Sequence, residues 1–300
     1  MLVIASRGSP LALWQARWVQ EQLAALGEDS RIEIIKTTGD KITSVPLNLV
    51  GAKGLFTKEI EDALLEGRAD LAVHSLKDLP TELPVGLMLA AIPAREDPRD
   101  AIVGIPIANL PKNAKVGTSS LRRAAQLRRL RPDLRIEPLR GNLDTRLRKL
   151  DQGHHYDAIM LAVAGLNRLG LQDRIAEIVS PDIVCPAVGQ GALAIEAAIG
   201  AGPLSALWEK LDDRLTRAAI TAERALLAAL GGGCQVPIGA LGTVAGGTLH
   251  LRGIVVSPDG LRSVRDSLEG PLAEAAEIGR RLGEALLAAG GGRILESVAG

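Results

Sequence analysis

The feature that most constrains the fold is an alternation of short apolar runs with helix-length amphipathic segments, which occurs twice along the chain. In the first pass, strands are expected at residues 2–5, 31–36 and 69–73, and helices at 11–26 and 58–66. In the second pass, strands are expected at residues 115–117, 135–139 and 157–163, and helices at 121–130 and 142–150. Two successive β-α-β-α-β patterns predict two α/β domains, which we expect to flank a cleft.

The rest of the chain has a different pattern. Residues 93–98 form a Pro-rich, charged linker, and a Pro/Gly-rich crossover after Cys185 leads into an expected strand at 192–197. Further helices are expected at residues 204–211, 213–230 and 272–289, and strands at 238–244, 248–256 and 261–268. This tail predicts a small α+β C-terminal domain with a three-stranded antiparallel sheet. The expected domains are residues 1–93 with 191–211, residues 97–187, and residues 213–300.

Composition and charge exclude several classes of protein. Hydrophobic residues make up 47% of the chain and aromatic residues only 2%, so the cores must consist of Leu, Ile, Val and Ala. Lys+Arg and Asp+Glu number 35 each, which argues against nucleic-acid and membrane-surface partners. Residues 1–7 lack the features of a signal peptide, and no apolar run has membrane-spanning length. We therefore expect a cytoplasmic protein, and a monomer because heptad repeats are missing.

A candidate site follows the expected strand at residues 69–73. Ser75, Lys77 and Asp78 come next, before Leu79 and Pro80 force a turn. In open α/β sheets, ligands bind at the carboxyl ends of the strands. The alternative is a polar surface turn in which Lys77 and Asp78 form an ordinary exposed pair.

A second candidate site opens the helix expected at 121–130. Arg122 and Arg123 lie in its first turn, where cations oppose the helix dipole at a cost of a few tenths to about 1 kcal/mol. Three hydroxyl side chains come directly before them: Thr118, Ser119 and Ser120. Hydroxyls, helix-start amides and guanidinium groups together predict an anion site. The alternative is a solvated basic helix face that continues through Arg128 and Arg129.

Several other cations also follow expected strands or open the helices after them. If both sheets turn their carboxyl edges to one cleft, seven cations converge there: Arg7, Lys53, Lys77, Arg122, Arg123, Arg140 and Arg146. Ser9 lies in the same loop as Arg7. Such a set suits a ligand with several carboxylates or phosphates, and the planar fork of Arg favours carboxylates. Among these cations Asp78 would stay ionised, and it could stabilise a developing positive charge or relay a proton.

Two further segments contain residues that could take part in binding or catalysis. The irregular segment 38–56 ends at Phe56 and is long enough to be a mobile lid, although a disordered insertion is the alternative. Cys234 lies in a Gly-rich loop, where an exposed thiol is available for covalent attachment; the alternative is an inert buried thiol. Four His and two Cys show no ligand spacing, so no metal site is expected.

The chain resembles the porphobilinogen deaminase family, also called hydroxymethylbilane synthases. Nine motifs in the family's order carry the resemblance: RGSPLALWQA from Arg7, KGLFTKE from Lys53, HSLKDLP from His74, REDPRDA from Arg95, GTSSLRRAAQL from Gly117, LRGNLDTRLRKLD from Leu139, LAVAGLNRLG from Leu161, AVGQGA from Ala187 and GGGCQVP from Gly231. The match covers nearly the whole chain. Ala52 departs from the pattern where a second lid glycine is common, and Cys185 stands where an aliphatic residue is expected; we interpret Cys185 as a structural thiol.

The resemblance implies two domains similar to periplasmic binding proteins plus a third small domain. It implies that Cys234 carries a dipyrromethane cofactor through a thioether, on which four porphobilinogen molecules are deaminated and joined before hydroxymethylbilane is released. Asp78 matches the catalytic carboxylate, and Phe56 could stack on a pyrrole ring. The residues implied to hold acetate and propionate groups are Arg7, Ser9, Lys77, Arg122, Arg123, Arg140, Arg146 and Arg168, with hydrogen bonds from Ser75, Thr118, Ser119 and Ser120. The rival hypothesis is a solute-binding or sensor protein that uses the same cleft without chemistry.

Overall fold

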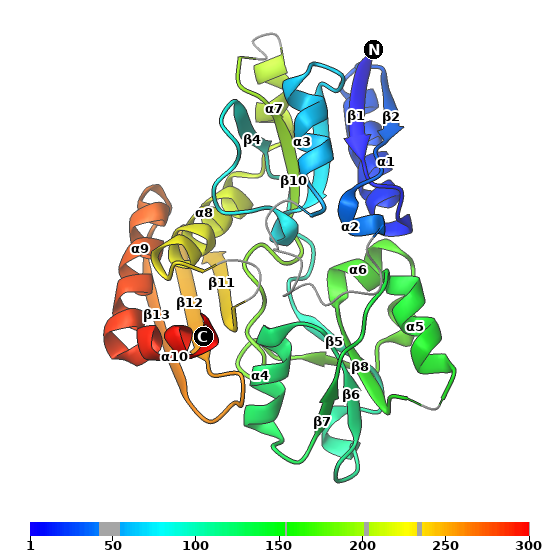
Figure 1. The fold of residues 1–300 in the computed structure, drawn as a ribbon. Helices are drawn as coiled ribbons and strands as arrows, with labels where there is room; N and C mark the ends of the chain where they lie inside the picture. The colour runs from blue at the N-terminus through cyan, green and yellow to red at the C-terminus, as the bar shows by residue number, and fades with distance from the viewer. Residues whose placement is uncertain (42–54, 154, 201–203, 233–235, 300) are drawn as a thin grey trace. The chain divides into compact units, whose positions relative to one another are not determined.

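Three β-sheets organise the part of the chain that the structure, a computed structural model, describes: residues 1–41, 55–153, 155–200, 204–232 and 236–299 (Figure 1). The chain divides into two compact units. The first comprises Met1–Glu96 and Gly191–Arg217, and the second comprises Asp97–Gln190 and Ala218–Gly300. The first unit contains one sheet, and the second contains the other two.

The sheet of the first unit has the strand order β2-β1-β3-β10-β4. Its strands are β1 (Leu2–Ser6), β2 (Ser30–Ile34), β3 (Leu71–Ser75), β4 (Leu87–Ala91) and β10 (Leu193–Ala198). β1, β2 and β3 are parallel, whereas β10 runs antiparallel between β3 and β4. The helices of this unit are α1 (Pro10–Ala25), α2 (Thr38–Lys41), α3 (Lys58–Leu65) and α7 (Ser205–Leu211).

Helices cover both faces of this sheet because its central strands are apolar on both sides. On β3, Val73 packs with α1 and α7, and Ala72 packs with α3, as the alternation of side chains along a strand requires. Ser9 is the N-cap of α1, and its hydroxyl accepts a hydrogen bond from the Ala12 N–H. Thr57 occupies the N-cap position of α3, but its side chain makes no capping hydrogen bond.

The first sheet of the second unit repeats this arrangement, with the order β7-β6-β8-β5-β9. Its strands are β5 (Asp100–Gly104), β6 (Lys115–Gly117), β7 (Arg135–Glu137), β8 (Ala158–Ala162) and β9 (Glu177–Val179). β6, β7 and β8 are parallel, and β5 runs antiparallel between β8 and β9. The helices that connect its strands are α4 (Leu121–Leu130), α5 (Leu143–Asp151) and α6 (Val163–Arg168).

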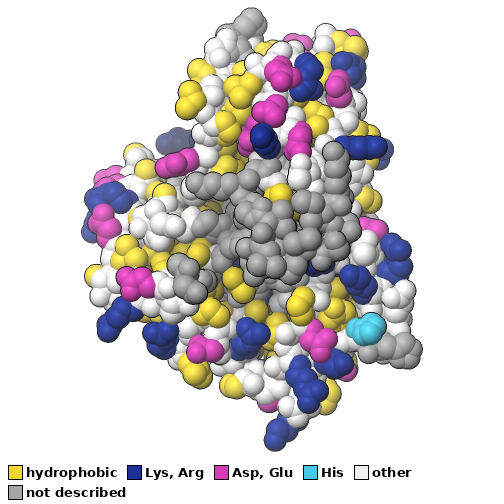
Figure 2. Space-filling view, viewed as in Figure 1, with side chains coloured by type: hydrophobic (Ala, Val, Ile, Leu, Met, Phe, Trp, Pro, Cys, Tyr) yellow, Lys and Arg dark blue, Asp and Glu magenta, His cyan; other side chains and the backbone are white. Residues whose placement is uncertain are grey.

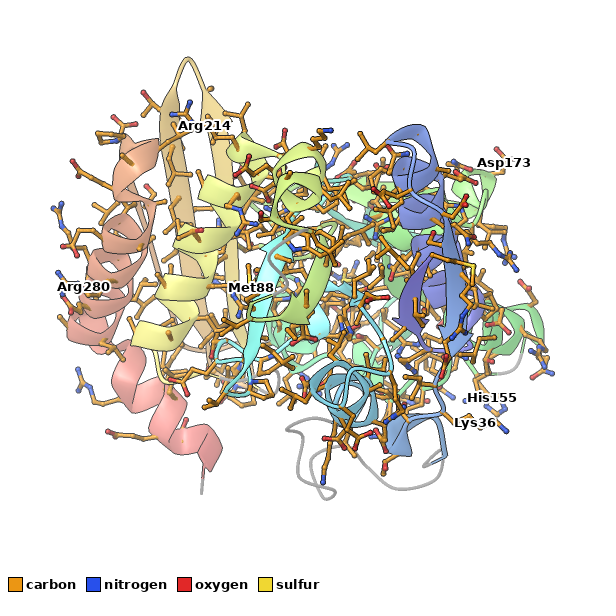
Figure 3. The ribbon with its side chains drawn as sticks, turned by 90° about the horizontal axis from the view of Figure 1, so that it is seen from above. Lys36, Met88, His155, Asp173, Arg214 and Arg280 are labelled. Carbon is orange, nitrogen blue, oxygen red and sulfur yellow. The ribbon has the colours of Figure 1, made fainter. Side chains whose placement is uncertain are left out.

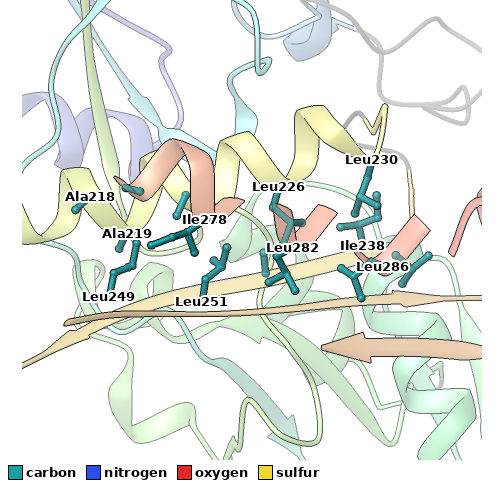
Figure 4. Close-up of a cluster of buried hydrophobic side chains, with 14 of the residues drawn as sticks. Ala218, Ala219, Leu226, Leu230, Ile238, Leu249, Leu251, Ile278, Leu282 and Leu286 are labelled. Carbon is teal, nitrogen blue, oxygen red and sulfur yellow. The ribbon is translucent and has the colours of Figure 1, made fainter. Parts of the chain in front are cut away.

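The third sheet is the antiparallel meander β11-β12-β13, formed by β11 (Ile238–Ala245), β12 (Thr248–Val256) and β13 (Ser263–Pro271). Gly246 and Gly247 make the tight turn between β11 and β12, both with positive φ, as a two-residue hairpin turn of type I′ requires. Side chains of α8 (Arg214–Ala229) and α9 (Ala275–Leu286) form the core with this sheet (Figure 4). A last helix, α10 (Gly292–Ala299), follows.

The structure confirms the predicted α/β class and the three-stranded antiparallel sheet. The helix at 121–130 and the strands at 115–117 and 248–256 have the predicted bounds, and β10 confirms the strand expected near 192–197. The sequence reasoning missed β4, β5 and β9. Each of them is an antiparallel partner, and β9, with three residues, is too short to show a period.

The surface agrees with the balanced composition. Figure 2 shows Lys and Arg side chains interspersed with Asp and Glu side chains on the face in view. Within the described part of the chain, none of the helices combines the length and the apolar character needed to cross a membrane.

Candidate active site

The first unit gathers its candidate residues at one edge of its sheet. β1 and β3 are parallel neighbours, with Ile4 opposite Leu71 and Ala5 opposite Ala72, so their carboxyl ends reach the same edge. Arg7 and Ser9 follow β1, and three candidates end or follow β3: Ser75, Lys77 and Asp78. Within this unit, the loops that carry these candidates therefore begin at the same edge of the sheet.

Asp78 lies on a short 3₁₀ turn, Leu76–Asp78, that β3 leads into directly. Leu76 is 1% exposed and Leu79 is 4% exposed, and the Leu79 N–H donates to the Leu76 carbonyl at 3.1 Å. These two buried leucines anchor the turn on both sides of Lys77 and Asp78. The Asp78 side chain is exposed, so its carboxylate is presented to solvent at the edge of the sheet.

Ser75, the last residue of β3, is held by a neighbouring helix. The side-chain amide of Gln15 on α1 donates to Ser75 Oγ at 2.8 Å, and Gln15 is 2% exposed. Since Ser75 Oγ accepts this bond, its own hydroxyl hydrogen can still be donated to a ligand oxygen. Sequence reasoning missed Gln15 because its partner lies 60 residues further along the chain.

Arg7 contacts Phe56. The guanidinium carbon of Arg7 lies 4.2 Å from the centroid of the Phe56 ring, within the range of a cation–π interaction. Gly39 permits this position of the ring, because a Cβ on residue 39 would lie 2.2 Å from Phe56 Cε1. Phe56 therefore already has a cationic partner from the candidate site. Lys53, most of the segment expected to be a lid, and Cys234 lie outside the described residues.

In the second unit, three hydroxyl residues follow β6, and each side chain makes a hydrogen bond within the unit. Thr118 Oγ1 accepts from the Ser120 N–H at 3.2 Å, and Ser120 Oγ accepts from the Arg123 N–H at 3.4 Å as the N-cap of α4. Ser119 Oγ donates to the Leu139 carbonyl at 2.9 Å, which ties the start of α4 to the segment after β7. The Ser119 hydroxyl hydrogen is thus used within the protein, and Oγ remains an acceptor.

Arg122 and Arg123 are buried, at 4% and 6% exposed, and do not form a solvated helix face. Their shared partner is Asp100, the fully buried first residue of β5. Arg122 Nη1 lies 2.7 Å from Asp100 Oδ2, and Arg123 Nε and Nη2 lie 2.9 and 2.7 Å from Asp100 Oδ1. We call Asp100, Arg122 and Arg123 the Asp100 cluster.

Charge in the Asp100 cluster is only partly balanced. Burial alone would raise the pKa of the Asp100 carboxyl, but the positive charges of Arg122 and Arg123 outweigh it and hold that pKa well below its usual range. Two cations against one carboxylate leave a net positive charge. Arg122 Nε is buried without a hydrogen-bond partner among the described residues, although its Nη1 also donates to the Cys185 carbonyl. The cluster therefore retains a net positive charge.

The same cluster explains two cations at the start of a helix. Arg122 and Arg123 lie in the first turn of α4, where their charges oppose the helix dipole, and this was interpreted as a sign of ligand binding. The structure shows that Asp100, on a neighbouring strand, supplies the compensating negative charge. Residues 101–103 were a usable signal, since a short apolar run that ends at Gly104 is typical of a buried strand. An acidic residue at the start of such a run needs a partner.

The remaining candidates of the second unit lie after its other parallel strands. Arg140 follows β7, Arg146 lies on α5 with its Nε donating to the Gly141 carbonyl at 2.7 Å, and Arg168 ends α6, which follows β8. Arg140 and Arg146 are half-buried, and Arg168 is 9% exposed. Each sheet thus places its own candidates beyond the carboxyl ends of its parallel strands.

Cys185 is buried at 2% exposed, in a small core cluster with Ala125, Leu241 and Ile254. Burial raises the pKa of its thiol to about 12. Almost none of it is thiolate at neutral pH, so the residue has the properties of a structural thiol.

We expect Asp100→Asn to destabilise the protein by about 3–5 kcal/mol, because two buried guanidinium groups lose their counter-charge. Urea unfolding of the purified variant measures the loss. The matched control is Glu277→Gln, which removes a carboxylate from the exposed pair with Arg280 on the outer face of α9 (Figure 3), and there we expect less than about 1 kcal/mol. Equal losses in the two variants would contradict the assignment.

The pH dependence of this difference has a defined sign. The folded-state pKa of Asp100 is depressed, so its stabilising contribution is present above the unfolded-state pKa, about 3.9, and is lost as the pH falls. The difference in unfolding free energy between wild type and Asp100→Asn should therefore shrink below about pH 4. Unfolding curves at pH 7 and pH 3.5 check this.

Comparison with known proteins gives matches over nearly the whole chain. A family model described as "Porphobilinogen deaminase, dipyromethane cofactor binding domain" matches residues 2–202, and "Porphobilinogen deaminase, C-terminal domain" matches residues 217–288. The chain is 53% identical over 300 residues to porphobilinogen deaminase of Syntrophobacter fumaroxidans, covering 98% of this chain and 97% of the relative. It is 50% identical over 301 residues to the protein of the same name from Trichlorobacter lovleyi, covering 99% and 96%.

Among solved structures, a periplasmic substrate-binding protein of an ABC transporter from Coxiella burnetii aligns with a TM-score of 0.45 at 14% identity. The alignment covers 70% of this chain and 92% of that one. The fold class follows from the strand order of the three sheets.

Proposed function

The chain belongs to the porphobilinogen deaminase family, and we propose that it deaminates four porphobilinogen molecules and joins them head to tail on a covalently bound dipyrromethane primer. The products are hydroxymethylbilane and ammonia, which makes the chain an enzyme of tetrapyrrole biosynthesis. The observation that carries the proposal is the exposed Asp78 carboxylate, held by buried leucines at the sheet edge shared with Arg7.

We assign Asp78 the catalytic role. Loss of ammonia from the substrate's aminomethyl group leaves a cationic azafulvene, and an ionised carboxylate beside the ring nitrogen stabilises that charge. The turn that carries Asp78 is already fixed by Leu76 and Leu79, so little reorganisation is needed when the charge develops. When bound, the primer supplies the nucleophilic pyrrole carbon.

The acetate and propionate groups of substrate and primer require cations and hydroxyl donors. Among the described residues, the net positive charge of the Asp100 cluster suits such a polycarboxylate. The residues that we propose hold these carboxylates are Arg7, Ser9, Lys53, Ser75, Lys77, Thr118, Ser119, Ser120, Arg122, Arg123, Arg140, Arg146 and Arg168. Phe56, which contacts Arg7, is proposed to stack on a pyrrole ring.

We propose Cys234 as the attachment point of the primer through a thioether. Cys185, the other cysteine of the chain, is buried with a raised thiol pKa, which argues against attachment there. Covalent attachment prevents intermediates from diffusing away during elongation.

We further propose a cytoplasmic monomer of three domains: residues 1–93 with 191–211, residues 97–187, and residues 213–300. The chain crosses between the two compact units at Glu96 and Gly191, close to the first proposed boundaries. The third sheet has a core of its own with α8 and α9, which supports a separate third domain.

Intact-protein mass combined with turnover tests the function. Protein made in cells that supply porphobilinogen should be heavier than its sequence by one dipyrromethane, and should convert porphobilinogen to hydroxymethylbilane. A mass equal to the bare sequence would contradict the primer. Binding of porphobilinogen without product would favour a solute-binding or sensor protein instead.

A further inference from the structure

Two buried ionisable side chains in the first unit take no part in the mechanism above. His74 on β3 is 6% exposed and Glu196 on β10 is fully buried. His74 Nε2 lies 3.1 Å from Glu196 Oε2. His74 Nε2 and both carboxylate oxygens of Glu196 make no hydrogen bond among the described residues, so close contact joins the two groups and a hydrogen bond does not.

Strand register explains how the two residues meet. On β10, Ala194 pairs with His74 and Glu196 pairs with Ala72, so His74 and Glu196 are diagonal neighbours on one face of the sheet. This is the face that α3 covers, where Glu61 is also buried at 6% exposed. Burial raises the pKa of the Glu61 carboxyl, the Thr57 hydroxyl opposes this effect, and charge on Glu196 adds to it.

Stability alone does not account for this pair. Removing an imidazole and a carboxylate from water costs several kcal/mol, and an apolar pair of similar volume is often neutral or stabilising by comparison. The second unit has a buried carboxylate on its corresponding antiparallel strand, since Asp100 on β5 pairs with the cations of α4. In both sheets, the antiparallel strand next to the parallel strands, β10 or β5, contains a buried acidic residue close to candidate site residues.

Three contacts hold the end of β3 from three directions. His74 contacts Glu196 on one face, Gln15 donates to Ser75 on the other, and the Leu76 N–H donates to the Ala192 carbonyl at 3.0 Å in the plane of the sheet. The turn with Asp78 begins at Leu76. We propose that His74 and Glu196 are positioning residues that fix the end of β3 and so set the place of the Asp78 carboxylate in the reaction proposed above.

The test uses His74→Ala, Glu196→Ala and the double variant, each measured for kcat and KM per molecule that carries the primer, as determined by intact mass. We expect each single variant to lose about tenfold in kcat with KM within about twofold, since displacement of a reacting group slows the chemical step. The double variant should lose no more than either single variant, because both remove one contact. Additive losses, or unchanged kcat, would overturn the proposal.

Two further variants separate positioning from stability. His74→Gln keeps an N–H donor opposite Glu196 and should recover most of the kcat, whereas His74→Leu with Glu196→Leu should fold at least as well as wild type and still lose about tenfold. Full kcat in the leucine pair would overturn the proposal even if the alanine variants fail to fold.

The matched control is Glu61→Gln, which alters a neighbouring carboxyl outside the pair. Its kcat should match wild type, and a loss equal to that of His74→Ala would overturn the assignment to the pair. Failure of the proposed function is distinguishable, because wild type itself would then form no hydroxymethylbilane.

Discussion

Asp78→Asn is expected to fold and to retain its primer, yet to lose turnover by a factor of about a hundred to a thousand. Asparagine keeps the size of the side chain and one acceptor oxygen but removes the negative charge that would stabilise the cationic azafulvene. Because Asp78 is exposed and the turn is held by Leu76 and Leu79, the substitution should leave the free energy of unfolding nearly unchanged. Single-turnover and steady-state rates on primer-bearing protein measure the effect.

The control for Asp78→Asn is Glu82→Gln, which neutralises another exposed carboxylate four residues further along the same segment. Its kcat and KM should equal those of wild type. Normal turnover in Asp78→Asn would remove the catalytic assignment. Equal losses in both variants would instead point to a general effect of charge on this surface.

Local patterns were sufficient to predict most of the parallel framework. An apolar run followed by a turn and an amphipathic helix can be recognised within about twenty residues, and β1 with α1, β6 with α4 and β7 with α5 follow that form. Since the carboxyl ends of parallel neighbours meet at one edge, placing Arg7 near Asp78 needed only the strand assignments.

What could not be predicted depends on contacts between distant segments. β10 pairs with β3 across more than a hundred residues of sequence, so nothing near His74 indicates that Glu196 lies beside it. Likewise, the chain around Arg122 contains no sign of Asp100, which comes from a strand that sequence reasoning missed. In both cases the missing information is the identity of the antiparallel strand.

The Asp100 cluster changes how the basic start of α4 is understood. Arg122 and Arg123 were expected to be available for a ligand, but most of their donors serve Asp100 and backbone carbonyls, including that of Met160. They therefore contribute to anion binding mainly through a fixed positive potential, because few of their donors are open. A rigid, pre-charged cluster costs less side-chain entropy on binding than mobile surface arginines would.

Cys234→Ser is expected to lack the primer altogether and to form no hydroxymethylbilane, because serine cannot make a thioether and elongation then has no starting point. Intact mass should equal that of the bare substituted sequence. Cys185 cannot take over the role: its thiol is 2% exposed, and burial raises its pKa to about 12. The matched control is Cys185→Ala, which should keep both the primer mass and the kcat while losing about 1 kcal/mol of stability from its core cluster with Ala125 and Leu241. A primer retained in Cys234→Ser and lost in Cys185→Ala would reverse the assignment of the two cysteines.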